Sequence, residues 1–181
     1  GKDHKVRFYG LRGNDKTGDY LQSKLEQTPV LVDHLKTIEG STPSTIVLSD
    51  PEYNDGHGER IFINEIGAAW SFGPDDLPED FFESDIVVFG GTALVPAVHN
   101  GLTILLIKAK ERGALTVVNT VYDFQSEIKN PGKRWPLGHS IKSYRYIDLL
   151  IMDREEAQHL SGCEDLTEAG DYFIKQGVSA C

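Results

Sequence analysis

Two carboxylates stand where an apolar segment gives way to the start of a helix. Residues 147–151 have the length and composition of a buried strand, and Asp153 and Glu156 follow with the spacing of a helix N-cap and its third helical residue. Ligands of open α/β sheets bind at the carboxyl ends of the strands. Carboxylates at such a junction could hold a metal ion, a water molecule, or a phosphate through a cation. The same spacing also describes a capping box that has no further role.

A glycine-rich stretch near the N-terminus separates a β-rich segment, residues 5–9, from a helical pattern. The spacing of Gly13 and Gly18 matches the glycines of a P-loop, but Asp19 and Tyr20 stand where the Lys and Ser/Thr would be. The stretch also lacks the dinucleotide-binding glycine pattern. By itself it indicates a tight strand-to-helix turn rather than a nucleotide site.

The composition is that of a globular protein. The chain has 181 residues, of which 39% are hydrophobic and 25% charged, and this length fits one compact domain. Its 28 Asp and Glu against 18 Lys and Arg give a net charge of -10, with no basic stripe that would neutralise a phosphate backbone. We therefore expect no nucleic-acid partner.

Membrane and disulfide signals are also missing from the sequence. No apolar segment approaches the roughly 20 residues of a membrane helix, and the polar N-terminus has no signal-peptide core. These features predict a cytoplasmic protein with no membrane partner. The spacing of Cys163 and Cys181 fits neither a disulfide framework nor a zinc site, so we expect two free thiols.

Residues 42–64 have the pattern of an antiparallel hairpin. Two β-rich runs flank a stretch dense in turn residues, which predicts a long polar tip. Apolar residues recur at a period of two in both runs and predict one apolar face: Ile46, Leu48, Ile61 and Ile63. An isolated hairpin would leave this face in water, so we expect something to cover it.

From Asp85 onward, short apolar runs alternate with helical patterns. The runs begin near residues 86, 115, 147 and 178, about 30 residues apart, which is the size of a βαβ unit. This repeat predicts a parallel sheet with right-handed crossovers.

Two helices are predicted between these runs. The first ends at Gly113, and its inward stripe consists of Val98, Leu102, Leu105, Leu106 and Ala109. The second spans residues 166–176 and is expected to turn Ala169, Phe173 and Ile174 inward before it stops at Gly177.

Taken together, four stretches of the chain resemble the ribokinase-like (PfkB) family of carbohydrate and nucleoside kinases. They are Gly10-x-x-Gly13-x-Asp15-x-x-Gly18; Thr42-Pro-Ser-Thr leading to Gly58-Glu-Arg and Gly67-Ala-Ala; Asp85-Ile-Val-Val-Phe-Gly-Gly91; and Asp153-Arg-Glu-Glu156-Ala with Leu160-Ser-Gly162. Their order and spacing extend over nearly the whole chain, residues 1–181. The resemblance implies a three-layer α/β fold, with helices on both faces of a parallel sheet and residues 42–64 as a small antiparallel β lid.

The resemblance also implies ATP-dependent transfer of the γ-phosphoryl group to a hydroxyl of a sugar, nucleoside or similar small alcohol. ATP and magnesium are the implied cofactors. Glu156 stands where the family has a Glu that acts on the magnesium–phosphate assembly, and Asp153 stands where the family has an Asn near the nucleotide phosphates. A carboxylate suits the first task because magnesium prefers hard oxygen ligands. Asp153 departs from the family's Asn, since it keeps the helix cap but adds a negative charge beside the phosphates.

For the substrate, the resemblance points to Asp15, Gly90, Gly91 and Asn119. Asn119 ends the second of the apolar runs, and its amide could bond a sugar hydroxyl; the alternative is a turn residue after a strand. Gly90 and Gly91 stand where some relatives carry an acidic residue. This chain is therefore expected to use a different substrate contact there, or backbone amides.

Two of the family's motifs do not occur in this sequence. The sugar-binding Gly-Gly loop would precede Gly1, and the Gly-Ala-Gly-Asp stretch, which supplies the anion hole and the general base, would follow Cys181. We therefore expect a central segment of a longer kinase, with no catalytic residue of its own and no activity in isolation.

The sequence is also compatible in part with two other classes of protein. A non-catalytic interaction module would retain the fold without the chemistry, which is consistent with Asp153, Gly91 and the missing catalytic stretch. A nicotinamide-dependent reductase has a similar sheet, but no Gly-x-Gly-x-x-Gly follows any predicted strand.

The resemblance suggests two covers for the apolar face of the 42–64 hairpin. One is the substrate-filled cleft of its own domain, and the other is the same ribbon of a second subunit in a lid-to-lid homodimer. We favour the homodimer, because the face is larger than a small polar sugar would cover.

Overall fold

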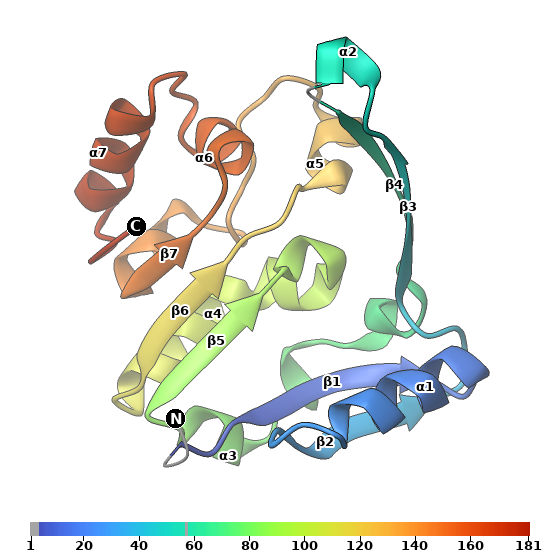
Figure 1. Ribbon diagram of the computed structural model, residues 1–181. Helices are drawn as coiled ribbons and strands as arrows, with labels where there is room; N and C mark the ends of the chain where they lie inside the picture. The colour runs from blue at the N-terminus through green and yellow to red at the C-terminus, as the bar shows by residue number, and fades with distance from the viewer. Residues whose placement is uncertain (1–3, 57) are drawn as a thin grey trace. The chain divides into compact units, whose positions relative to one another are not determined.

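The computed structural model describes residues 4–56 and 58–181, and the chain divides into two compact units, Gly1–Ser71 and Phe72–Cys181 (Figure 1). The first unit contains a parallel strand pair and an antiparallel hairpin, and the second contains a three-stranded parallel sheet. The predicted α/β class is therefore confirmed. The extent of a single kinase-like domain over residues 1–181 stays a prediction.

The first unit begins with a parallel βαβ arrangement. It consists of β1 (Arg7–Gly13), α1 (Lys16–Leu25) and β2 (Leu31–Ile38), and the two strands pair in parallel up to Gly13 opposite Ile38. The sequence predicted that the first strand would end before Gly10. That boundary was wrong, because pairing with β2 keeps the glycine-rich residues in the ladder as far as Gly13. The strand β2 was not predicted.

The predicted hairpin is confirmed by β3 (Ser44–Asp50) and β4 (Glu59–Glu65), which pair antiparallel. The tip of the hairpin contains α2 (Tyr53–Gly56), where Asn54 and Asp55 have left-handed backbone angles, a conformation that Asn and Asp tolerate better than most residues. The central pairs are Ile46 with Ile63, Val47 with Phe62 and Leu48 with Ile61. All six of these side chains are exposed, so both faces of the hairpin are apolar.

The second unit is built on parallel strands in the order β5 (Ile86–Gly90), β6 (Leu115–Asn119) and β7 (Leu149–Ile151) (Figure 1). These strands confirm the apolar runs predicted at 86, 115 and 147. The fourth run begins to pair next to β7, where Leu149 bridges Ala180 in parallel.

Two long helices supply much of the core of this unit. In α4 (Pro96–Glu111), which lies against β6, the whole predicted stripe from Val98 to Ala109 is buried. In α7 (Leu166–Gln176), Ala169 and Phe173 are buried, but Ile174 is 50% exposed. The inward position predicted for Ile174 was wrong, because it lies about 100° around the helix from Phe173.

Short helical segments connect these elements: η1 (Gly67–Ser71), η2 (Pro74–Asp76), α3 (Glu79–Phe82), η3 (Thr92–Leu94), α5 (Phe124–Lys129), η4 (Ile141–Tyr146) and α6 (Arg154–Ser161). The prediction that Cys163 and Cys181 are free thiols is confirmed. Among the helices of residues 4–56 and 58–181, none has the length and apolar character that crossing a membrane requires.

Candidate functional site

The carboxyl ends of three neighbouring strands bring most of the predicted site residues to one edge of the second unit's sheet. Gly90 ends β5 and is paired with Asn119 at the end of β6, which is paired in turn with Ile151 at the end of β7. Asp153 and Glu156 follow Ile151 at the start of α6. Residues that are far apart in sequence therefore meet at the edge where open α/β sheets bind ligands.

Backbone hydrogen bonds tie together the loops that leave this edge. The amide of Gly91 donates to the carbonyl of Asn119 at 2.8 Å, and the amide of Thr120 donates to the carbonyl of Ile151 at 2.9 Å. Gly91 has a φ of 58°, in the left-handed region that favours glycine. These bonds fix the chain directly after β5 and β6.

The helix cap predicted at Asp153 is confirmed. Oδ1 of Asp153 accepts a hydrogen bond from the amide of Glu156 at 2.8 Å, and Oε2 of Glu156 accepts one from the amide of Asp153 at 3.2 Å. The box leaves Oε1 of Glu156 available, because this oxygen accepts no hydrogen bond from any residue that the structure describes. Capping and ligand binding are therefore compatible roles for Glu156.

Thr120 makes the shortest hydrogen bond to Glu156, and this contact was not predicted from the sequence. Its hydroxyl donates to Oε2 of Glu156 at 2.6 Å, across 36 residues of sequence. The side chain of Asn119, which was predicted to contact substrate, is exposed, and its amide makes one long hydrogen bond of 3.4 Å to the carbonyl of Ile151. No motif distinguishes Thr120 from any other polar residue after a strand.

A buried polar cluster also joins the loops after β5 and β6. The hydroxyl of Thr92 lies 3.0 Å from Nδ1 of His99, and Nε2 of His99 lies 3.8 Å from Oδ2 of Asp123. Burial lowers the pKa of His99, although the nearby carboxylate of Asp123 acts in the opposite direction. Oδ1 of Asp123 accepts a hydrogen bond from the amide of Ser126 and caps α5. The sequence did not predict this cluster.

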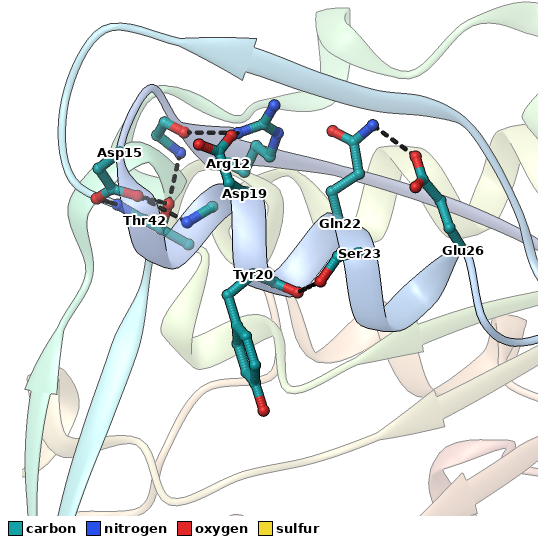
Figure 2. Close-up of polar contacts among 10 residues, drawn as sticks. Arg12, Asp15, Asp19, Tyr20, Gln22, Ser23, Glu26 and Thr42 are labelled. Carbon is teal, nitrogen blue, oxygen red and sulfur yellow. Dashed lines mark hydrogen bonds and ion pairs between the residues drawn. The ribbon is translucent and has the colours of Figure 1, made fainter.

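In the first unit, Asp15 forms the N-cap of α1 and contacts the start of the hairpin segment (Figure 2). Its Oδ1 accepts hydrogen bonds from the amide of Gly18 at 2.7 Å and the hydroxyl of Thr42 at 2.6 Å, and its Oδ2 accepts one from the amide of Thr42 at 2.8 Å. The hydroxyl of Thr42 contributes most to lowering the pKa of this carboxyl. Both oxygens thus serve the fold, and the substrate role of Asp15 stays a prediction.

The glycines around Asp15 allow backbone segments to approach closely. A Cβ atom added to Gly13 would lie 2.2 Å from the carbonyl oxygen of Gly40, and one added to Gly18 would lie 2.4 Å from the carbonyl oxygen of Gly13. The amide of Gly13 also donates to the hydroxyl of Thr42 at 3.0 Å. Gly13 and Gly18 therefore allow a tight turn between strand and helix, as predicted from the sequence.

Groups of three or more His, Cys, Asp or Glu side chains that could hold a metal ion are not found among the described residues. The carboxylates at the edge of the sheet still fit magnesium. This ion is commonly bound through one or two carboxylates together with waters and substrate phosphates, rather than by a cage of protein ligands.

A parallel sheet with carboxylate and amide side chains at its carboxyl edge is typical of α/β proteins that bind a small ligand there. The family model for pfkB family carbohydrate kinases matches residues 2–180, and the chain therefore belongs to this family. No curated protein sequence matched the chain.

Solved structures confirm the ribokinase-like fold. The E. coli protein named ribokinase II, in its apo form, has a TM-score of 0.75 and 16% identity, covering 97% of this chain and 55% of that one. Its complex with ATP and Mg²⁺ has a TM-score of 0.74 at the same identity of 16%, with coverages of 97% and 55%. Adenosine kinase from Sinorhizobium meliloti has a TM-score of 0.74 and 19% identity, with coverages of 98% and 52%. The chain spans about half the length of these proteins.

Proposed function

We propose that the protein to which this chain belongs transfers the γ-phosphoryl group of ATP to a hydroxyl of a sugar, nucleoside or similar small molecule. One observation carries the proposal. Glu156 lies at the carboxyl edge of the sheet, with Oε2 held by Thr120 and Asp153 and with Oε1 available to a ligand. Family membership and the ATP and Mg²⁺ complex of the E. coli protein support it.

Glu156 and Asp153 are the proposed residues for the phosphate side of the site. When bound, magnesium supplies neutralisation of the charge on the phosphates. Oε1 of Glu156 would bind the ion or accept a hydrogen bond from one of its water molecules. Asp153 caps the first turn of α6, and its negative charge repels the phosphates.

Asp15, Gly90, Gly91 and Asn119 are the proposed residues for the substrate side. The exposed amide of Asn119 is suited to a hydroxyl, because it can both donate and accept a hydrogen bond. Since Gly90 and Gly91 offer no side chain, discrimination at that point would depend on backbone groups. The adenosine kinase likeness keeps nucleosides among the candidate substrates.

We further propose that this chain is an incomplete part of the enzyme. It spans 55% of the E. coli structure and 52% of the adenosine kinase structure, and phosphoryl transfer requires an anion hole and a base that this sequence does not supply. The alternative is a non-catalytic interaction module with the kinase fold. A cytoplasmic location stays a prediction.

The hairpin of β3 and β4 is proposed as a lid that pairs with the lid of a second subunit. Its six exposed apolar side chains, on both faces, favour burial against another protein surface. The substrate cleft of the same subunit is the other proposed cover.

The complete protein should be assayed for ATP-dependent phosphorylation of a panel of pentoses, hexoses and nucleosides with Mg²⁺ present. We expect turnover on at least one member, and none from the 181-residue chain alone. A complete protein that binds no Mg·ATP and modifies no member of the panel would support the interaction module instead.

A further inference from the structure

We propose that Thr120 is a positioning residue, whose hydroxyl sets the orientation of the Glu156 carboxylate toward the magnesium–phosphate assembly. This inference rests on the proposed phosphoryl-transfer function. It assigns to the loop after β6 a task that the two-residue helix cap does not perform.

The hydrogen bond from Thr120 is well defined. At 2.6 Å to Oε2 of Glu156, it has the short length of a hydroxyl bonded to a carboxylate. The carbonyl of Ile151, the other acceptor near the hydroxyl, lies at 3.3 Å and is the weaker partner. The backbone of Thr120 is fixed as well, since its amide donates to the same carbonyl at 2.9 Å.

The contact reduces the freedom of a side chain that has three rotatable bonds. Oε2 of Glu156 receives two hydrogen bonds from different elements, one from Thr120 after β6 and one from the amide of Asp153 before α6. The residue is only 8% exposed, so a rotated carboxylate would lose both bonds inside the fold. With Oε2 fixed, the direction of Oε1 is also fixed before any ligand binds.

Helix capping does not explain the hydrogen bond from Thr120 to Glu156. The reciprocal hydrogen bonds of Asp153 and Glu156 already complete the capping box. Removing the Thr120 hydroxyl would leave that box intact and would remove only its short bond to Glu156 on α6 and its longer one to the carbonyl of Ile151. The effect expected is therefore on the site rather than on the formation of α6.

The test uses Thr120→Val and Thr120→Ala, which remove the hydroxyl, and Thr120→Ser, which keeps it, all in the complete protein. The control is Thr103→Val, because Thr103 makes a buried hydroxyl bond of 2.7 Å to Ser143 away from the sheet edge. Mg·ATP affinity is measured by calorimetry without acceptor substrate, and kcat and KM are measured on the best acceptor. Circular dichroism establishes that each variant is folded.

Loss of the hydroxyl should weaken Mg·ATP binding or lower kcat by about 10-fold, as is typical when a partner that orients a metal ligand is removed. The acceptor KM should stay within about twofold, because Thr120 acts through Glu156 and not on the acceptor. Thr120→Ser should restore most of the lost affinity and turnover. Thr103→Val should change neither quantity.

A double-mutant cycle separates positioning from general damage. If Thr120 acts through Glu156, then Thr120→Val should add little to the defect of Glu156→Gln. Folded valine and alanine variants with wild-type affinity and kcat, a serine variant as impaired as these, or fully additive defects would each overturn the inference. A wild-type protein that binds no Mg·ATP would instead overturn the proposed function, and this inference with it.

Discussion

The hydroxyl of Thr42 lies 2.6 Å from Oδ1 of Asp15, across 27 residues of sequence. Through this contact, the residue that begins α1 is joined to the segment that leads into the hairpin. The same hydroxyl accepts a hydrogen bond from the buried amide of Gly13 at 3.0 Å. Thr42 is itself 3% exposed, so its hydroxyl completes a local network rather than facing solvent.

Thr42→Val should therefore destabilise the first unit. A buried amide without a partner costs about 1–3 kcal/mol, and Gly13 would lose its acceptor. Urea unfolding measures the change. The control is Thr45→Val, since the hydroxyl of Thr45 makes only an exposed bond to Asn64, and it should stay within about 0.5 kcal/mol of wild type. Equal shifts for both variants would contradict the structural role of Thr42.

Stability should depend on pH through His99. Burial lowers the folded-state pKa of His99 from its ordinary value of 6.5. Between the folded-state and unfolded-state pKa values, the unfolded chain therefore binds more protons than the folded protein. The stabilisation is therefore complete above pH 6.5 and is lost as the pH falls from there toward the folded-state pKa. Asp123, at 3.8 Å, moderates the effect because it favours the charged ring.

His99→Asn should flatten this part of the stability profile, measured by urea unfolding between pH 5 and 8. A His99→Asn protein with an unchanged slope would show that other groups determine the pH dependence.

The proposed lid dimer predicts a change of assembly when charge is placed on the hairpin. Ile46→Asp with Ile61→Asp should convert dimer to monomer in analytical ultracentrifugation of the complete protein, since burying unpaired carboxylates is unfavourable. Both side chains are 60% exposed. Ile128→Asp serves as the control, because Ile128 is 75% exposed on α5, outside the hairpin. A wild-type protein that is monomeric at high concentration would indicate instead that the hairpin closes on its own substrate cleft.

Asp153→Asn should keep the helix and strengthen Mg·ATP binding. Asparagine caps helices about as well as aspartate, and the change removes a negative charge from the proposed phosphate site. Asp153→Ala is the contrasting variant, because it should lose about 1 kcal/mol of stability together with the cap. Calorimetric titration with Mg·ATP measures the affinity. Weaker binding by the asparagine variant would show that the carboxylate of Asp153 contacts the metal.

Residue spacing along a single helix or strand was enough to predict several local features of the fold. The cap at Asp153 and Glu156, the apolar stripe of α4 and the period-two residues of the hairpin all follow from spacing along one element. The parallel pairing of β5, β6 and β7 was predicted from the length of the repeat.

Other features depend on contacts that the local sequence does not encode. The strand β2 mixes charged and apolar residues without regular alternation, and only its pairing with β1 draws Gly10 into a strand. Two contacts of the second unit join separate elements: the hydrogen bond between Thr120 and Glu156, and the approach of His99 to Asp123. Because their residues are far apart in sequence, no periodic pattern predicts these contacts. The ligand roles of Asp15, Gly90, Gly91 and Asn119 stay predictions.

The role of Glu156 is the centre of the proposed function, and Glu156→Gln in the complete protein tests it most directly. Turnover should be measured against Mg²⁺ concentration, with Glu155→Gln, an exposed neighbour on α6, as the control. We predict that Glu156→Gln lowers kcat by about 10- to 100-fold and raises the Mg²⁺ requirement, while acceptor affinity stays within about twofold of wild type. Collapse of acceptor affinity with an unchanged Mg²⁺ requirement would contradict the assignment of Glu156 to the phosphate side of the site.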